Sequence, residues 1–169
     1  GSEMCIRDSN IPCVSVSTLE SMAYNFLSTD CIVCAVMDAR CSQVYNALFE
    51  IKSGVVTRLC DDRALSLDDL KSELLSVDGR IIIVGDGTDI TFKHIGDEIQ
   101  NAEPAPVNLK YQRASSTALV AFEMINNGQT VSAQELMPVY LRLPQAQREL
   151  NKNLEVEQND STRMRPRRI

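Results

Sequence analysis

The chain has 169 residues, 44% of them apolar and 24% charged, with a formal net charge of −6. This composition excludes a collagen-like chain, a coiled coil and wholesale disorder, and no apolar run approaches the roughly 20 residues that a membrane-spanning helix needs. The last nine residues hold four arginines and no acid, so residues 1–160 carry a net charge of −10, which disfavours nucleic-acid binding by the body of the chain.

The first thirty residues predict one strand and one helix. Residues 1–9 have no periodic pattern, so we interpret them as an artefact or scar and set them aside. A strand is expected over Ile11–Val16, and Ser17 with Glu20 forms a capping box that predicts the start of a helix. The apolar face of this helix consists of Leu19, Met22, Ala23, Phe26 and Leu27. Because this pair of elements starts abruptly, we expect residues 10–29 to be the tail end of an earlier lobe.

Residues 30–150 predict a second lobe with a mixed sheet and helices on its faces. The segments expected to be extended are Cys31–Met37, Gln43–Ile51, Val55–Leu59, Ile81–Val84, Val107–Lys110 and Val139–Leu141. Helices are expected from Ser66 to near Gly79, over Thr91–Gln100, and from a cap at Ser115 to Asn127. Three consecutive strands followed by alternating helices and strands indicate an α/β fold.

Two further expectations concern the ends of this lobe. The last helix should face inward with four apolar residues, which are Ala118, Leu119, Phe122 and Ile125. Residues 151–169 are polar and then basic, which is typical of a tail or linker.

The six cysteines favour a reducing environment. Cys31 and Cys34 form a C-x-x-C spacing, but it lies in a predicted strand rather than at a helix start, where a redox motif needs it. There is no second C-x-x-C and His94 is the single histidine, so a four-ligand zinc site is disfavoured. We expect reduced cysteines in the core, no metal, and a cytoplasmic location.

Four motifs, taken in order, resemble the TsaB family over about residues 11–150. They are Val16-Ser17-Thr18-Leu19-Glu20, Met37-Asp38-Ala39-Arg40 with Val44-Tyr45, Val84-Gly85-Asp86-Gly87, and Pro138-Val139-Tyr140-Leu141-Arg142. The resemblance implies an actin/Hsp70-like (ribonuclease H-like) lobe. It also implies a bacterial, non-catalytic dimerisation subunit that supports the catalytic subunit TsaD in threonylcarbamoyl transfer to the tRNA adenosine beside the anticodon.

The resemblance further implies the partners and cofactors. A TsaE-like ATPase joins the TsaD-like subunit, with ATP and Mg on these partners and none bound by this chain alone; the chain contacts tRNA indirectly and self-association as a homodimer is an option. The family's opening strand and Gly/Ser-rich loop have no counterpart before Ile11, so we expect an N-terminally truncated fragment. The apolar face over Leu19–Leu27 should then be exposed as an aggregation-prone patch.

Seven residues are candidates for subunit or ligand contacts: Asp38, Arg40, Tyr45, Gly85, Gly87, Tyr140 and Arg142. The turn at residues 38–42 has no glycine to bring N–H groups close to a phosphate, so a structural turn is favoured there. The Gly-Asp-Gly at residues 85–87 is either a turn that ends a strand or a nucleotide contact. Tyr140 and Arg142 alternate with apolar neighbours, as in an edge strand.

The alternative function is an ATPase or sugar kinase of the actin/Hsp70 superfamily. Peptidase activity is rejected, because one histidine cannot supply paired metal ligands and no G-x-S-x-G motif supports a hydrolase dyad. The basic segment Arg163–Arg168 has three interpretations: a disordered tail, an arm that touches tRNA, or the start of an appended N-acetyltransferase domain.

Overall fold

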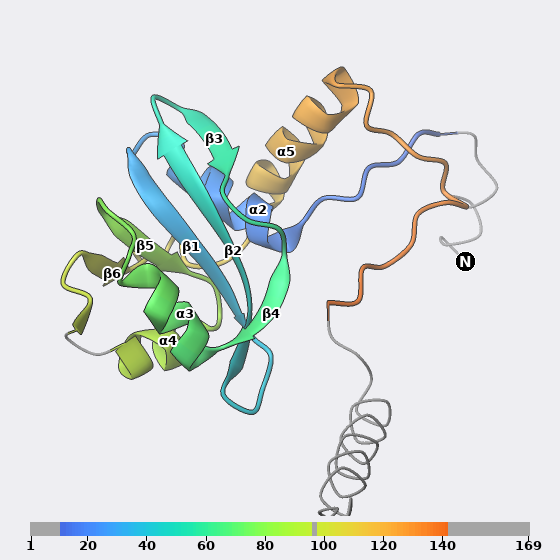
Figure 1. The fold of residues 1–169 in the computed structure, drawn as a ribbon. Helices are drawn as coiled ribbons and strands as arrows, with labels where there is room; N and C mark the ends of the chain where they lie inside the picture. The colour runs from blue at the N-terminus through green and yellow to red at the C-terminus, as the bar shows by residue number, and fades with distance from the viewer. Residues whose placement is uncertain (1–10, 96–97, 142–169) are drawn as a thin grey trace, which may run out of the picture. The chain divides into compact units, whose positions relative to one another are not determined.

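A computed structural model describes residues 11–95 and 98–141 (Figure 1). The chain divides into two compact units, residues 1–138 and 139–169, and the described part of the second is residues 139–141. The first unit has a mixed α/β fold in which helices lie against both faces of a six-stranded sheet. Within the described ranges, no helix is long and apolar enough to span a membrane.

The sheet has the strand order β3-β2-β1-β5-β6, and β4 also pairs with β2. Its strands are β1 (Cys31–Asp38), β2 (Gln43–Lys52), β3 (Val55–Arg58), β4 (Arg63–Ser66), β5 (Ile81–Val84) and β6 (Ala102–Pro104). β1 is antiparallel to β2 and parallel to β5, and β5 is parallel to β6. The expected strands β1, β2, β3 and β5 are confirmed, and β5 is buried on both faces, as a continuous apolar run predicts.

The sequence-based expectations failed at three extended segments. β4 was not predicted, because its four residues are half-buried and show no clear alternation. The strand expected over Val107–Lys110 is wrong, since the sixth strand lies at residues 102–104 and ends at the first proline of the Pro-Ala-Pro sequence. The strand expected over Ile11–Val16 is also wrong, because the segment pairs only through one bridge, between Cys13 and Val131.

Helices lie on both sides of the sheet. Their bounds are α2 (Thr18–Ala23), continued by a 3-10 turn (Tyr24–Phe26), α3 (Leu67–Leu74), α4 (Thr88–Ile95) and α5 (Ala114–Asn126). α5 packs on α2 and the following 3-10 turn. α2 packs on the face that carries Phe49 and Val84, whereas α3 and α4 cover the face that carries Cys34 and Ile83. The three helices predicted after Ser66 are present, but α3 ends at Leu74 rather than near Gly79, and α4 spans Thr88–Ile95 rather than Thr91–Gln100.

α2 begins where the capping box places it. The Ser17 hydroxyl accepts a hydrogen bond from the N–H of Glu20 at 3.3 Å, but the Glu20 carboxylate does not return the bond. It pairs instead with the Arg58 guanidinium at 2.6 Å, and the same guanidinium binds Asp62 at 2.6 Å. Because Ser17 also donates to Asp62, these four side chains tie the start of α2 to the end of β3.

The apolar face of α2 is buried, so the exposed patch expected over Leu19–Leu27 is wrong. Leu19, Met22 and Phe26 are each at most 3% exposed. They pack in one cluster with the residues on one face of strands β1, β2 and β5, and these strands belong to the same compact unit. The sequence pattern gave the apolar face correctly but not the surface that covers it.

α5 presents the opposite face from the one expected. Its buried residues are Ser116 and Val120, whereas Leu119 is 47% and Phe122 63% exposed, and Ile125 is 50% exposed. Polar pairs hold its inner side against α2 and the 3-10 turn: Ser116–Asn25 at 2.7 Å, Thr117–Ser21 at 2.7 Å and Tyr24–Glu123 at 2.5 Å. A pattern that counts only apolar residues cannot recognise a helix held by its polar side.

The caps of α5 differ in how well they were predicted. The N-terminal cap position is occupied by Arg113 without a side-chain hydrogen bond, so the cap expected at Ser115 is wrong. The stop at Asn127-Gly128 is confirmed, with Gly128 at φ 71° and its N–H bonded to the Ile125 carbonyl. In the second unit, residues 139–141 form no strand; proline flanks this segment at positions 138 and 144 and removes two backbone donors.

Candidate functional site at the carboxyl ends of β1 and β5

The carboxyl ends of β1 and β5 lie side by side, and the chain leaves them in opposite directions. β1 runs into β2 on one side, and β5 leads through α4 to β6 on the other. In α/β sheets, a crevice between neighbouring parallel strands whose connections diverge is the usual place for a ligand. Gly85, Asp86 and Gly87 form the loop after β5, and Asp38 ends β1.

The β5 loop presses against the backbone of β1. Gly85 has φ 113°, and a Cβ atom built on it would lie 2.0 Å from the Val36 carbonyl oxygen. The Gly87 N–H donates to that same oxygen at 3.3 Å. Only glycine satisfies both the left-handed backbone and the close approach at position 85. The interpretation of Gly-Asp-Gly as a turn that ends a strand therefore has a direct physical basis.

The turn after β1 closes on itself. Arg40, Cys41 and Ser42 all have positive φ, at 65°, 53° and 55°. The Asp38 carboxylate accepts the Arg40 N–H at 2.7 Å, and the N–H groups of Ala39 and Gln43 bond to carbonyls within the turn. These N–H groups are thus used internally, which leaves them no free direction toward a phosphate.

The structure brings several of the expected site residues together. The Asp38 N–H donates to the Asp86 carboxylate at 3.2 Å, so the ends of β1 and β5 are bonded directly. Tyr45 lies opposite Met37 in the β1–β2 register, on the sheet face that carries α2. Arg40 lies in the turn. Tyr140 belongs to the second unit, and Arg142 lies outside the described residues.

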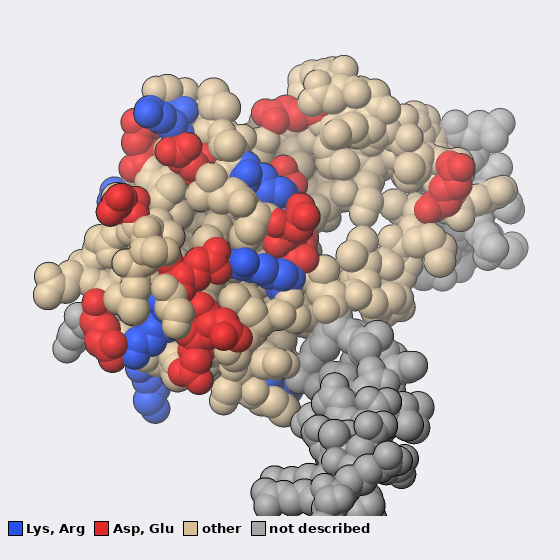
Figure 2. Space-filling view, in the orientation of Figure 1, with Lys and Arg blue, Asp and Glu red and all other residues tan. Residues whose placement is uncertain are grey.

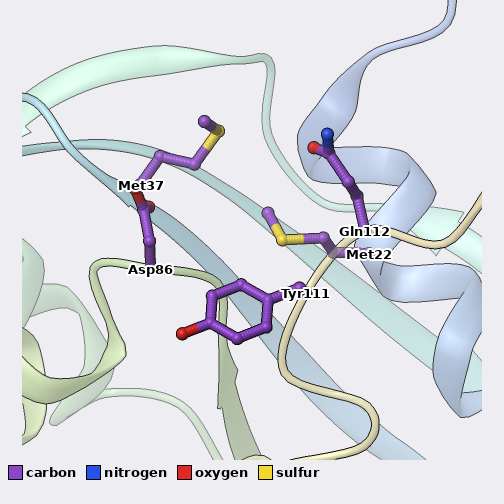
Figure 3. A pocket seen from close by; sticks show the side chains of 5 residues that line it. All are labelled: Met22, Met37, Asp86, Tyr111 and Gln112. Atoms are coloured by element: carbon purple, nitrogen blue, oxygen red, sulfur yellow. The ribbon is translucent and has the colours of Figure 1, made fainter.

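A pocket of about 320 Å³ opens at this end of the sheet (Figure 3). It is lined by Met22, Met37, Asp86, Tyr111 and Gln112. Met22 comes from α2 and Met37 from β1, while Tyr111 and Gln112 come from the segment before α5. None of these five was among the candidate site residues. Asp86 had a signal, its place after a buried strand, but nothing in the sequence indicates that Tyr111 and Gln112 fold onto it.

Hydrogen bonds fix the segment that carries Tyr111. The Asn25 amide donates to the carbonyls of Leu109 and Tyr111, both at 2.9 Å. The Gly85 N–H donates to the Lys110 carbonyl at 2.8 Å, which joins this segment to the β5 loop. The backbone of the segment that carries Tyr111 is thereby held by two different parts of the fold.

Of the charged residues around the pocket, Lys110 forms an ion pair with Asp89 and none with Asp86. The Lys110 ammonium binds the Asp89 carboxylate at 2.8 Å, and this hydrogen bond raises the pKa of Lys110. The same ammonium lies 5.8 Å from the centre of the Tyr111 ring.

On the molecular face in Figure 2, basic and acidic residues alternate rather than form separate patches, so this face offers no basic stripe to a nucleic acid.

The cysteines and the histidine lie apart from this pocket. Cys31 and Cys34 are free and buried in β1, as expected, whereas Cys41 is exposed in the turn, contrary to the expectation of core cysteines. Burial raises the pKa of the Cys34 thiol to about 12. His94 contacts Asp68 at 2.8 Å. Within residues 11–95 and 98–141, no three His, Cys, Asp or Glu side chains are grouped so that they could hold a metal ion.

The fold and this site define the chain first as a mixed α/β domain with a ligand-sized pocket at a strand switch point. Solved structures give the same fold: "YeaZ from Pseudomonas aeruginosa" matches with TM-score 0.59 and 19% identity, over 77% of this chain and 59% of that one. A second structure, described as an uncharacterised protein with similarity to peptidase YeaZ from Pseudomonas aeruginosa, matches equally well over 78% of this chain and 59% of its own.

The sequence comparison is more specific. The chain is 27% identical over 139 residues to the tRNA threonylcarbamoyladenosine biosynthesis protein TsaB of Bacillus subtilis (strain 168), covering 82% of this chain. No family model matches the chain. The resemblance to the TsaB family that the four motifs carry is thus confirmed. The chain spans 59% of the length of the relatives it matches.

Proposed function

We propose that the chain is a non-catalytic subunit that supports a TsaD-like catalytic subunit in forming threonylcarbamoyladenosine on tRNA. The observation that carries the proposal is the similarity to Bacillus subtilis TsaB, which is named for this biosynthesis. The α/β unit is then one actin/Hsp70-like lobe, a finer assignment than the mixed α/β fold itself.

The turn after β1 supports the non-catalytic part of the proposal. An ATPase of this superfamily needs backbone N–H groups turned toward the phosphates. In this chain the Asp38 carboxylate occupies the Arg40 N–H at 2.7 Å, and its negative charge would repel a phosphate. The geometry therefore favours a supporting subunit over an ATPase or sugar kinase.

The proposal includes the partners and their location. A TsaD-like subunit and a TsaE-like ATPase would hold the ATP and Mg, and the tRNA would be bound through them. A homodimer is the alternative assembly of this chain. All of these would operate in the cytoplasm. The interleaved charges of the face in Figure 2 agree with an indirect contact to tRNA.

The test is complex formation with the TsaD-like subunit of the same organism. The full chain is mixed with that subunit at micromolar concentration and followed by size-exclusion chromatography with light scattering, which also reports a homodimer. A heteromeric complex supports the proposal, and its absence contradicts it. A parallel titration with ATP distinguishes the alternative, because binding and turnover by the isolated chain would indicate an ATPase or kinase.

A further inference from the structure

The pocket at the ends of β1 and β5 contains a carboxylate, Asp86, that interacts electrostatically with the Lys110 ammonium but forms no ion pair within the described residues. Asp86 is exposed, and its side chain accepts the Asp38 N–H at 3.2 Å. In the part of the chain that the structure describes, no lysine or arginine forms an ion pair with it. Asp89, three residues further along, is paired with Lys110 at 2.8 Å. Asp86 therefore retains acceptor capacity for a ligand.

The walls around this carboxylate are apolar and polarizable. Met22 and Met37 contribute thioethers and Tyr111 an aromatic ring, with the Gln112 amide at the rim (Figure 3). Thioether and methylene groups pack well against an aliphatic chain, and an aromatic face attracts a cation. The volume of about 320 Å³ lies at the small end of the range of ligand pockets and is large enough for an arginine side chain.

We propose that this pocket is a socket for one arginine side chain of a partner protein. The guanidinium would pair with the Asp86 carboxylate through two N–H groups beside the Tyr111 ring, which the Lys110 ammonium approaches at 5.8 Å, and its methylenes would pack against Met22 and Met37. Charge complementarity favours this occupant, because the lining residues carry one negative charge and the nearby Lys110 ammonium is already bound by Asp89. A phosphate-bearing ligand would be repelled. The socket follows from the chemistry of the pocket and does not depend on the proposed function.

The NMR signals of the methionine methyl groups give a direct readout of arginine binding in the pocket. The full chain labelled with ¹³C at the methionine methyls is titrated with the peptide acetyl-Gly-Arg-Gly-amide and, separately, with its citrulline counterpart, which keeps the shape and loses the charge. We expect the Met22 and Met37 signals to shift with the arginine peptide, and the citrulline peptide to bind about tenfold more weakly or worse. Each signal is assigned by a Met→Leu substitution.

Matched variants locate the binding. Asp86→Asn keeps an oxygen for the Asp38 N–H and removes the charge, so it should reduce arginine binding about tenfold or more. Asp61→Asn, an equal charge change at an exposed residue that does not line the pocket, should bind as the wild type does. Tyr111→Phe should retain binding, and Tyr111→Leu should weaken it. Undisturbed signals of the other methionines report that each variant is folded.

Three results would overturn the socket. One is the absence of a shift at Met22 and Met37 up to roughly 10 mM arginine peptide. Another is equal binding of the citrulline peptide or of Asp86→Asn. The third is adenosine shifting the same two signals at lower concentration than the arginine peptide, which would identify a nucleoside site instead.

Discussion

The turn after β1 and the loop after β5 lie next to each other but differ in backbone conformation and in position relative to the pocket. The β1 turn, residues 38–42, contains no glycine and has three residues at positive φ, and the N–H groups of Ala39 and Arg40 bond to Gln43 and Asp38. The β5 loop, residues 85–87, uses glycine to press against Val36 and leaves the Asp86 carboxylate facing a pocket. The β1 turn is held by hydrogen bonds among its own and adjoining residues, and the β5 loop borders the pocket.

The two strand ends differ in whether their carboxylate lies at the pocket. Asp38 and Asp86 are both carboxylates at the ends of neighbouring parallel strands. Asp38 binds the Arg40 N–H within its own turn, whereas Asp86 receives one N–H from the neighbouring strand. Residue type and the number of accepted N–H groups do not distinguish them; Asp86 lines the pocket and Asp38 does not.

The largest effect is expected where the β5 loop meets β1. Gly85→Ala should lower the free energy of unfolding by about 3 kcal/mol or more, because it adds a backbone clash to an unfavourable φ. Gly79→Ala is the matched control: Gly79 has φ 92° but open space around it, so about 1–2 kcal/mol is expected. Urea unfolding measures both, and equal losses would contradict the close approach.

The next largest effect concerns the pH dependence of stability, for which Cys34 inside β1 is compared with Cys41 in the following turn. Burial raises the pKa of Cys34 from 9.0 to about 12, so the folded chain keeps a proton that the unfolded chain releases. The free energy of unfolding is therefore unaffected by this thiol below about pH 9 and falls as the pH rises toward 12. At pH 10 the loss is about 1.4 kcal/mol.

Cys34→Ala should remove this part of the pH dependence, and Cys41→Ala should leave it unchanged. The measurement is urea unfolding of the three proteins at pH 7 and pH 10. Identical differences between the two pH values in the wild type and Cys34→Ala would argue against a buried thiol at this position.

A smaller effect is expected at the acceptor of the β1 turn. Asp38→Ala removes the bond to the Arg40 N–H and should cost about 1 kcal/mol of unfolding free energy. Asp61→Ala, at an exposed residue without such a bond, should change it by less than about 0.5 kcal/mol. Thermal and urea unfolding test the pair, and an Asp38→Ala variant as stable as Asp61→Ala would show that the turn does not need its acceptor.

The smallest effect should stabilise the chain. Ser42 has φ 55°, a conformation that costs a side-chain-bearing residue about 1–2 kcal/mol relative to glycine. Part of this gain is offset by the entropy of glycine in the unfolded chain. Ser42→Gly should therefore raise the free energy of unfolding by about 0.5 kcal/mol, as measured by the midpoint of urea unfolding. A lower midpoint would mean that this serine is not strained.

The parts of the fold that were predictable are those whose signal is local. The capping of α2 by Ser17, the buried β5 run and the glycine stop of α5 each depend on a few neighbouring residues. The inward face of α5 was missed because Ser116 and Thr117 hold it through partners more than 90 residues away in sequence. The pocket was missed for the same reason, since Tyr111 reaches Asp86 only through tertiary contacts.

The most direct test of the proposed function is a reconstituted modification reaction. Unmodified tRNA, the TsaD-like and TsaE-like subunits, threonylcarbamoyl adenylate and ATP with Mg are incubated with and without the full chain, and threonylcarbamoyladenosine is quantified in digested tRNA by mass spectrometry. We expect product to form at a much higher rate with the chain than without it, and none from the chain alone. Equal product in its absence would contradict a supporting role.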